Sequence, residues 1–375
     1  MAMTLDSSFQ RIGRLTPLAT VLALIESRVG AAMPRISPVA AALGYTLAQD
    51  AVTSERPPRP IALRDGFAVD AAAVADAGSY VPVALPPASR RIDVGEALPE
   101  GADAVLPFDA VALRGERAEA VAAVAAGEGV LPVGGDASPR TPLRRAGERL
   151  RAIDLAAIAA SGIAELTVRA PRIRIAAAGA AKAAPIEAAV AMLGRFIGAA
   201  GGLVPTHPSA LEAALADETA DAVIAIGGTG SGRRDDAVKT LARLGRVEAH
   251  GIAVSPGNTA AFGFLADRPV LLVPGRLDAA LAVWLLIGRQ LVAKLAGGSA
   301  ADAPALLPLK RKVASNIGLT ELIPVRCSAG MAEPLGCGYL SFAALARSDG
   351  WIVVPADSEG FGAGTEVAVR SWPQI

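Results

Sequence analysis

The sequence predicts a multi-domain protein in which an α/β unit is combined with units made mostly of β-strands. The chain has 375 residues, which is enough for two to four domains. Between about residues 171 and 300, short apolar runs alternate with helical patterns, as in a mostly parallel sheet covered by helices. Residues 65–130 and 303–375 instead contain short strands separated by Gly, Pro and Asp turns, which predicts little helix in these parts.

Composition narrows the classes of protein that the chain can be. Hydrophobic residues make up 52% of the sequence and charged residues 19%, so there is ample material for large cores. Lys plus Arg and Asp plus Glu number 36 each, and this balance argues against nucleic acid as the main partner. The apolar run Ala279–Ala296 contains Arg289, Gln290 and Lys294, which favours a buried helix over a membrane span. The first residues do not look like a signal peptide, and we expect a cytoplasmic protein.

The first segment is expected to start with a helix and to end at a crossing between domains. Leu18, Val21 and Ile25 share one face of a helix that Pro17 can begin. The stretch 57–60 contains three prolines, which is typical of a linker or of a chain that crosses from one domain to another.

Asp65 lies in a turn between the apolar runs 61–63 and 67–69. Its Asp-Gly pair favours a tight turn that feeds the following strand, and turn chemistry alone favours this structural role. The alternative places the Asp65 carboxylate at the rim of a cleft. Extended runs up to Val130 complete the β-rich module.

A basic stretch follows at 134–149. Such a stretch could bind an acidic ligand, although a solvated connection is the commoner outcome. Its basic side chains are those of Arg140, Arg144, Arg145 and Arg149.

The predicted α/β unit is arranged around one glycine-rich loop. The run Val223–Ile226 predicts a buried strand, and a helical pattern begins at Ala237. Four glycines in six residues let backbone N–H groups approach an anion without interference from Cβ atoms. A strand, a glycine loop and a helix N-terminus together predict a phosphate cradle. The expected cradle consists of Gly227, Gly228, Thr229, Gly230, Ser231 and Gly232, with Arg233 and Arg234 adding positive charge.

Asp235 and Asp236 follow the loop, where a carboxylate could hold a metal, a hydroxyl or an amino group. The spacing matches neither GxxxxGK[ST] nor GxGxxG, so neither an ATP site nor a dinucleotide site follows. A competing interpretation is a plain glycine turn with Asp235 or Asp236 as the helix N-cap. Because parallel sheets bind ligands beyond the C-terminal ends of their strands, the loops at Gly179, 227–236 and 274–278 belong to one edge.

Five segments resemble, in the same order, motifs of the MoeA/gephyrin-type enzymes that insert molybdenum into molybdopterin. Arg64–Val69 (RDGFAV) looks like that family's MDGYAV motif, and Gly95–Val105 looks like its G-x-x-hP-x-GADAVV stretch. Gly227–Asp236 (GGTGSGRRDD) is similar to the GG-x-S-x-G-x-x-D loop. Ser255–Thr259, with a Phe-Gly pair after it, resembles KPGKP…FG, and Pro274–Gly275 resembles LPGNPVS. The resemblance covers nearly the whole chain.

The resemblance implies a division into four domains. An elongated domain would consist of residues 1–55 and 135–170, with a β-rich domain of residues 56–134 inserted into it. A three-layer, molybdopterin-binding α/β domain would span residues 171–300, and a β-barrel would span residues 301–375. The resemblance also implies a homodimer, with the active cleft between the α/β domain of one subunit and the β-rich domain of the other.

The family's functional residues can be carried over onto this sequence. Asp65 would lie in the cleft, and Asp235 or Asp236 would take the acidic role of the α/β domain, with Asp65 and Asp236 holding Mg²⁺. Counting from the glycines selects Asp235, whereas counting back from Lys239 selects Asp236. The implied ligands are adenylylated molybdopterin and molybdate, and a molybdoenzyme would receive the product. Further contacts would come from Ser255, Pro256, Gly257, Asn258, Pro274, Gly275 and Arg276.

Several charged residues of the family motifs are replaced in this chain. The acidic triplet of the α/β domain appears as Gly179–Ala181, and the two lysines of KPGKP appear as Ser255 and Asn258. Each lost carboxylate removes a group that could bind molybdate, adenylate or magnesium. Each lost lysine removes charge directed at phosphate, which arginines at other positions could supply.

Two functions therefore stay open from the sequence. In the first, the protein is a molybdotransferase that cleaves the phosphoanhydride of adenylylated molybdopterin and places molybdate on the dithiolene. In the second, it is a carrier or chaperone that keeps the pterin-phosphate cradle without the insertion chemistry.

Overall fold

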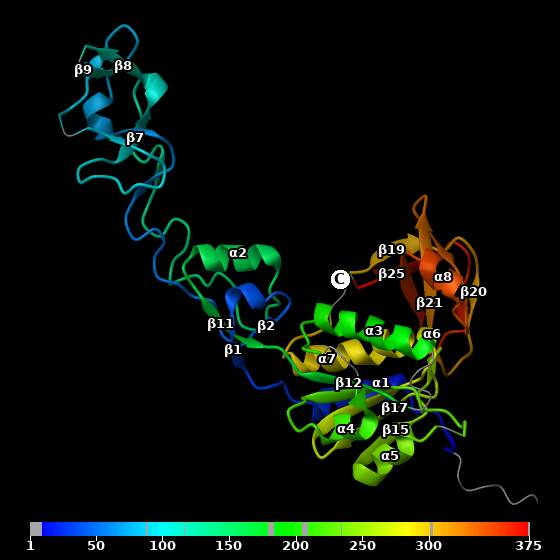
Figure 1. Ribbon diagram of the computed structural model, residues 1–375. Helices are drawn as coiled ribbons and strands as arrows, with labels where there is room; N and C mark the ends of the chain where they lie inside the picture. The colour runs from blue at the N-terminus through cyan, green and yellow to red at the C-terminus, as the bar shows by residue number, and fades with distance from the viewer. Residues whose placement is uncertain are drawn as a thin grey trace, which may run out of the picture.

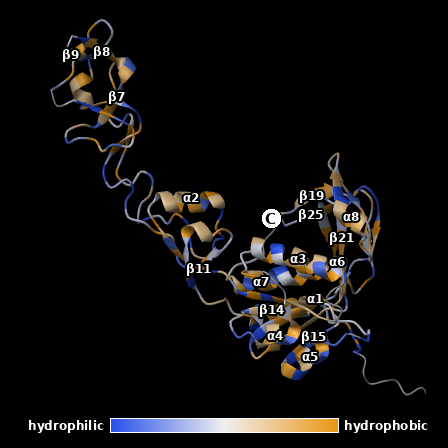
Figure 2. Cartoon of the chain, viewed as in Figure 1, coloured by the Kyte–Doolittle hydropathy of each residue, from blue (hydrophilic) through white to orange (hydrophobic). Residues whose placement is uncertain are grey.

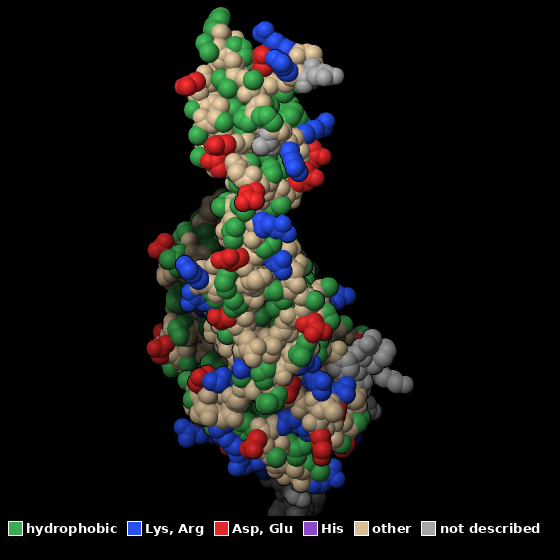
Figure 3. Space-filling model, turned by 90° about the vertical axis from the view of Figure 1, so that its left-hand side faces the viewer, with side chains coloured by type: hydrophobic (Ala, Val, Ile, Leu, Met, Phe, Trp, Pro, Cys, Tyr) green, Lys and Arg blue, Asp and Glu red, His purple; other side chains and the backbone are tan. Residues whose placement is uncertain are grey.

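The computed structural model describes residues 10–373 except 88, 116, 179–183, 205–208, 234 and 301–302. The molecule is elongated, with a β-rich arm (residues 56–134) at one end and the α/β unit and a C-terminal β unit at the other (Figure 1). Figure 3 shows the molecule narrowing where the arm meets the body. This architecture confirms the predicted multi-domain α/β plus β fold.

A small antiparallel sheet connects the arm to the body. It consists of β1 (Arg35–Pro38), β11 (Glu165–Arg169) and β2 (Thr46–Leu47), with the 3₁₀ turn η1 (Val39–Ala41) and helix α2 (Ala152–Ala160) packed on it. Helix α1 (Leu18–Arg28) packs on α7 of the α/β unit instead, because its buried Val21 and Ile25 join that core. The first segment expected for the elongated domain, 1–55, is therefore divided: α1 packs on the α/β unit, and β1 and β2 belong to the connecting sheet.

The arm is built from short strands around two small cores. Its central strand β4 begins at Gly66, where a Cβ would lie 2.1 Å from the Leu106 carbonyl oxygen, so the Asp-Gly turn needs its glycine. Two 3₁₀ turns, η2 (Ala71–Val74) and η3 (Phe108–Ala110), complete the arm. The strands are β3 (Ile61–Ala62) with β10 (Val130–Leu131), β4 (Gly66–Val69) between β6 (Arg90–Ile92) and β7 (Ala104–Pro107), and β9 (Arg117–Ala120) between β5 (Val83–Ala84) and β8 (Val111–Arg114).

The α/β unit is a six-stranded sheet between two helical layers. One layer contains α1, α3 (Ala184–Ala199), α6 (Leu277–Val283) and α7 (Arg289–Leu295), and the other contains α4 (Leu211–Ala216) and α5 (Ala237–Leu244). Helix α5 carries hydrophobic and hydrophilic residues on different sides (Figure 2), and its buried side faces the sheet. The strand order is β13 (Ser209–Ala210), β12 (Ile173–Ala177), β14 (Ala222–Ile226), β18 (Arg268–Val273), β17 (Ala261–Leu265) and β15 (Arg246–His250); the first four are parallel.

The apolar run predicted as one buried helix is buried but not regular. Between α6 and α7 the chain makes a π-helical turn, η4 (Trp284–Gly288). A Cβ on Gly288 would lie 2.5 Å from the Trp284 ring, so the glycine makes room for the indole. No helix among the described residues is long and apolar enough to cross a membrane.

The C-terminal unit is the predicted β-barrel. Strands β22, β21, β23, β25 and β19 pair in that order, and a bridge between Leu309 and Ala332 closes the ring. Strand β16 (Val254–Ser255) pairs with β21 of the barrel, although β17, β18, α6 and α7 separate it from the barrel in the sequence. The remaining elements are β19 (Ala305–Pro308), β20 (Val313–Ala314), β21 (Thr320–Ser328), β22 (Met331–Pro334), α8 (Phe342–Arg347), β23 (Gly350–Val354), β24 (Gly360–Phe361) and β25 (Glu366–Ser371).

Candidate functional site at the edge of the α/β sheet

Two of the three predicted loops meet directly at the edge of the sheet. Strands β14 and β18 are parallel neighbours, and the Gly227 N–H donates to the Val273 carbonyl at 2.8 Å. Gly227 has φ +96°, and a Cβ there would lie 2.5 Å from the Ala178 carbonyl oxygen. Gly275 lies against Gly227 in turn. Glycine is therefore required where the loops cross. Gly179, in the third loop, lies outside the described residues.

A hydroxyl contact connects the glycine loop to the loop 255–259. The Thr229 and Thr259 Oγ1 atoms are 3.0 Å apart, and Thr229 is 2% exposed. The Thr229 carbonyl also lies 3.0 Å from His250 Nε2. In the loop 255–259, Pro256 and Gly257 are buried, whereas Ser255 is half-buried and Asn258 is exposed. The structure thus brings together three of the predicted cofactor-binding segments: 227–232, 255–258 and 274–276.

The glycine loop leaves a row of backbone donors unused. Among the described residues, none accepts a hydrogen bond from the N–H of Gly228, Thr229, Gly230 or Ser231. Gly228 and Thr229 are buried, and a buried N–H without a partner costs free energy comparable to a lost hydrogen bond. Such donors are normally satisfied by water or by a ligand, so this part of the loop can receive an anion.

The first turn of helix α5 is already capped by Gln10, from the start of the chain. Gln10 Oε1 accepts from the N–H groups of Val238 and Lys239 at 3.0 and 3.1 Å. Gln10 Nε2 donates to the Gly228 and Gly230 carbonyls at 3.0 and 2.8 Å, and the Gln10 side chain is almost fully buried. The cap is therefore supplied by Gln10; Asp236 occupies the N-cap position without a side-chain cap bond.

The two aspartates after the loop have different surroundings. Asp235 is half-buried, and its Oδ2 accepts from the Gly232 N–H at 2.8 Å, so this carboxylate holds the loop in shape. Asp236 is exposed and makes no side-chain hydrogen bond with the described residues. Of the two candidates that sequence counting could not separate, Asp236 has the carboxylate that is free to meet a ligand.

The predicted arginines are distributed around the rim. Arg233 is exposed, and Arg234 lies outside the described residues. Arg276 forms a bidentate pair with the buried Asp278, at 3.1 and 2.5 Å, and this hydrogen-bonded pair raises the pKa of the guanidinium. The Arg276 guanidinium also lies 4.9 Å from the centre of the Tyr339 ring, in the C-terminal unit. Arg276 thus keeps its positive charge at the edge of the loops.

Asp65 is not part of this cluster within one chain. It lies in the arm, at the opposite end of the molecule from α5, and its Oδ1 accepts from the Val94 N–H at 2.7 Å (Figure 1). Within the described residues, no group of three or more His, Cys, Asp or Glu side chains is placed to hold a metal ion. One chain therefore does not assemble the expected Mg²⁺ site of Asp65 and Asp236.

Three residues that shape this site were not among the predicted site residues: Gln10, Thr259 and Asp278. Thr259 and Asp278 belong to the loops 255–259 and 274–278 that the sequence singled out, whereas Gln10 carries no local signal. Gln10 is 218 positions from Gly228, so only the folded chain could reveal the contact.

Three family models match the chain in succession. The MoeA N-terminal region (domain I and II) matches residues 16–162, and a domain described as a probable molybdopterin binding domain matches residues 184–294. The MoeA C-terminal region (domain IV) matches residues 307–372. Together they account for most of the chain in the order in which the structure has its units.

Individual relatives and solved structures agree with these models. A protein of Methanocaldococcus jannaschii described as a molybdopterin biosynthesis protein is 33% identical over 164 residues, 43% of this chain and 38% of that protein. A molybdopterin molybdenumtransferase of Haemophilus influenzae is 27% identical over 185 residues, 46% of each protein. The matched part thus spans less than half of either relative.

Solved structures match over a larger share of the chain. The molybdopterin biosynthesis MoeA protein of Pyrococcus horikoshii has a TM-score of 0.75 at 24% identity, covering 96% of this chain and 99% of that one. A molybdenum cofactor biosynthesis protein of Pyrococcus furiosus has a TM-score of 0.61 at 20% identity, covering 96% and 100%. These likenesses concern the fold, and they extend over all its units. With three consecutive family models and this shared fold, the chain belongs to the MoeA family.

Proposed function

We propose that this protein acts in molybdenum cofactor biosynthesis, where it binds adenylylated molybdopterin and inserts molybdate into the dithiolene. The observation that carries the proposal is the set of N–H groups at Gly228–Ser231 that donate to no described residue, two of them in buried residues. Closely spaced backbone donors form an anion-binding concavity. The family membership and the name of the Haemophilus influenzae relative support molybdopterin as the source of that anion.

The loops supply binding and orientation. Backbone N–H groups of the glycine loop would hold a phosphate group of the ligand, and the exposed Arg233 would add positive charge beside it. Arg276 would approach the ligand from the neighbouring loop, with its guanidinium fixed by Asp278. Asp236 would hold a hydroxyl or amino group of the ligand. Asp65 and Asp236, the residues expected to hold Mg²⁺, lie far apart within one chain, so they could share a metal ion only across two chains.

A homodimer is part of the proposal. Asp65 directly precedes β4 in the arm, and Figure 1 shows the arm at the opposite end of the molecule from the α/β unit. A second copy could place its arm, and with it the Asp65 carboxylate, opposite Asp236. Sedimentation of the purified protein would then give twice the mass of one chain, 37.8 kDa.

A carrier of molybdopterin is the second candidate. It is favoured because two carboxylates at the loops already have partners: Asp235 accepts from the Gly232 N–H, and Asp278 pairs with Arg276. Phosphoanhydride cleavage needs groups that neutralise charge and orient the attacking oxygen. A protein without them could still bind the cofactor and deliver it to a molybdoenzyme.

AMP release separates the two candidates. The purified protein is incubated with adenylylated molybdopterin, molybdate and Mg²⁺, and free AMP and bound pterin are measured together. Release of AMP that depends on molybdate supports insertion, and Asp236→Asn should reduce it at least tenfold. Retained pterin binding without AMP release overturns insertion and leaves the carrier. If the wild-type protein shows neither AMP release nor pterin binding, the proposed ligand is wrong.

A further inference from the structure

The loop between β22 and α8 of the barrel carries an exposed aromatic ring to the edge of the candidate site. Tyr339 in this loop is 58% exposed, and the Arg276 guanidinium lies 4.9 Å from the centre of its ring. Arg276 follows Gly275, which lies against Gly227 of the glycine loop. The Tyr339 ring therefore borders the loops that are proposed to hold the ligand.

Two buried carboxylates fix the backbone on either side of this ring. The Gly338 N–H donates to Glu321 Oε1 at 2.5 Å, and Glu321 is 4% exposed. The Leu340 N–H donates to Asp278 Oδ2 at 3.2 Å, and Asp278 is 3% exposed. Burying a carboxylate is costly unless it is paired or hydrogen-bonded, and here both carboxylates hold one short loop. The ring of Tyr339 is thus exposed on a backbone that is fixed at both neighbours.

Asp278 orients the guanidinium as well as the loop. Arg276 donates to it through Nε and Nη2, at 3.1 and 2.5 Å. The third nitrogen of this guanidinium, Nη1, donates to no described residue. Because Asp278 belongs to α6 and Tyr339 to the barrel, one carboxylate sets a charge of the α/β unit beside a ring of the barrel.

A fixed ring beside a fixed cation suits a ligand that is both flat and anionic. Every heteroaromatic base has a π-face that can stack on an aromatic side chain. A guanidinium donates charge-assisted hydrogen bonds to phosphate oxygens. Adenylylated molybdopterin, the proposed ligand, has phosphate groups between two flat ring systems, adenine and pterin.

We infer that Tyr339 is a specificity-determining residue of this site, whose ring stacks on a flat heteroaromatic ring of the ligand. Arg276 Nη1 donates to a phosphate oxygen of the same ligand. The inference rests on the proposed function, because it concerns the same site. It adds that a phosphate without a flat ring uses the glycine loop alone and gains nothing from Tyr339.

Three probes separate the flat ring from the phosphate. AMP carries both, ribose 5-phosphate carries the phosphate and sugar without the ring, and 6-carboxypterin carries the pterin with an anionic group. The affinity of the full chain for each probe is measured by calorimetry. We expect at least one probe that has a flat ring to bind about tenfold more tightly than ribose 5-phosphate.

Tyr339→Leu is the deciding variant. It should weaken the tighter of the two ring-bearing probes about tenfold and leave the affinity for ribose 5-phosphate unchanged. Loss with AMP assigns the stacked ring to adenine, and loss with 6-carboxypterin assigns it to the pterin. Tyr339→Phe keeps the ring and should bind as the wild type does. Phe342→Leu removes another exposed ring of the barrel and is the matched control.

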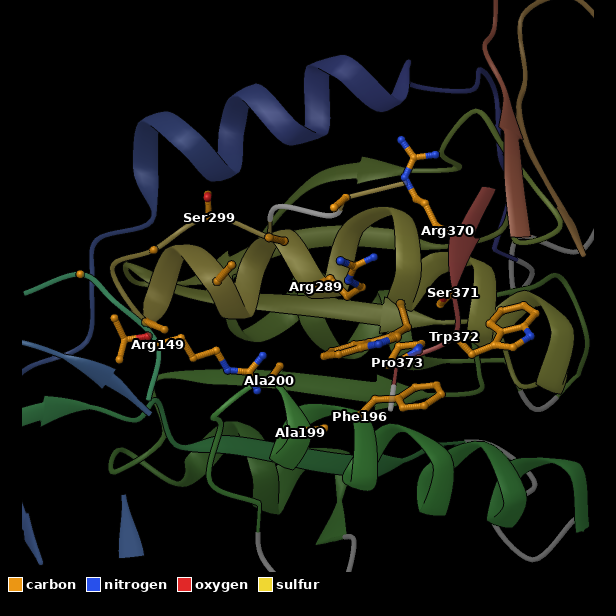
Figure 4. Close-up of a pocket in the computed structure, with 18 residues that line it drawn as sticks. Arg149, Phe196, Ala199, Ala200, Arg289, Ser299, Arg370, Ser371, Trp372 and Pro373 are labelled. Carbon is orange, nitrogen blue, oxygen red and sulfur yellow. The ribbon is translucent and has the colours of Figure 1, made fainter. Parts of the chain in front are cut away.

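Binding of the flat ring elsewhere is detected with Phe196→Leu. Phe196, Trp372 and Arg149 line a separate cavity of about 580 Å³ (Figure 4). The described residues that line it include none of the loops 227–232, 255–258 and 274–276. Lower affinity in Phe196→Leu but not in Tyr339→Leu would place the ring in that cavity and overturn the inference.

Two further outcomes distinguish this inference from the proposed function. If Tyr339→Leu and the wild type bind both ring-bearing probes equally, the role of Tyr339 is wrong, whereas the phosphate cradle is retained. If the wild type binds no probe at millimolar concentration, ribose 5-phosphate included, the cradle is wrong and the role of Tyr339 with it.

Discussion

The glycine loop and the first turn of helix α5 are neighbouring sets of backbone donors in different states. No described residue accepts from the N–H groups of residues 228–231, and the position of these donors depends on the local conformation of the loop. The N–H groups of Val238 and Lys239 are satisfied by Gln10 Oε1, which comes from a distant part of the chain. The first set depends on glycines, whereas the second depends on one packed side chain. The two sets should therefore respond to different substitutions.

Gly227→Val should give the largest effect, because it attacks the conformation on which the loop depends. Its φ of +96° disfavours any side chain, and its Cβ would lie 2.5 Å from the Ala178 carbonyl oxygen. We expect a loss of roughly 3 kcal/mol in the free energy of unfolding, measured with urea. Gly198→Ala in helix α3, where nothing lies within 4 Å, is the control and should stabilise slightly. Equal midpoints for Gly227→Val and wild type would contradict this account of the loop.

Gln10→Ala separates the structural use of the loop from its use in binding. The substitution leaves the N–H groups of Val238 and Lys239 and two carbonyls without partners, which should cost about 1–3 kcal/mol. If the loop is a phosphate cradle, the freed N–H groups should also increase its affinity for AMP, measured by calorimetry. Gln290→Ala, at an exposed position, is the matched control. Lower stability with unchanged AMP affinity would limit Gln10 to a structural cap.

Asp154 provides the carboxylate that pairs with Arg144 and Arg151, whereas no described carboxylate pairs with Arg149. Hydrogen bonds from Arg151 lower the pKa of Asp154 to about 2, and Arg144 lies 3.4 Å from the same carboxylate. Because the pKa is lower in the folded state, this carboxylate stabilises the protein above its ordinary pKa of 3.8, and the gain disappears as pH falls through about 2.

Asp154→Asn should remove about 1–2 kcal/mol at neutral pH and flatten the loss of stability between pH 4 and about 2. Chemical denaturation at several pH values measures both effects. Asp76→Asn, at an exposed position in the arm, should change neither. An unchanged acid profile in Asp154→Asn would mean that Arg144 and Arg151 are held by other contacts.

The pair Asp235→Asn and Asp236→Asn should give the smallest change in stability. Asp235 accepts from the Gly232 N–H, so its substitution should cost about 1 kcal/mol. Because Asp236 is exposed, its substitution should not change the free energy of unfolding measurably, whereas ligand binding or AMP release should fall. The reverse pattern would give the ligand-facing role to Asp235.

The sequence was sufficient for most of the fold and for the position of the loops. Val223–Ile226 was predicted as a buried strand from its composition, and the parallel neighbours β14 and β18 carry their loops to one edge as expected. The run of glycines marks the loop in the sequence, although the close approach of Gly227 to the Ala178 carbonyl becomes visible only in the fold. The barrel and the β-rich arm were likewise recognisable from strand length and turn residues.

The remaining features depend on contacts between distant residues. Gln10 lies in a short polar stretch without periodicity, and its contacts are with residues more than 200 positions away. The sequence marked Arg144 and Arg149 as members of one basic stretch, but it could not show that Arg144 meets Asp154 while Arg149 faces a cavity. The division of roles between Asp235 and Asp236 also required the direction of each side chain, which a loop with one extra residue does not reveal.

The short strand β16 has a practical consequence for anyone who dissects this protein. Val254 and Ser255 are supplied from within the α/β unit, yet they pair with Thr320 and Glu321 of the barrel. In a barrel expressed alone, the edge of β21 that pairs with β16 would be unpaired, and another extended segment could pair with it. If the barrel were replaced by that of a relative, residues 254–255 would likewise have to be replaced together with it.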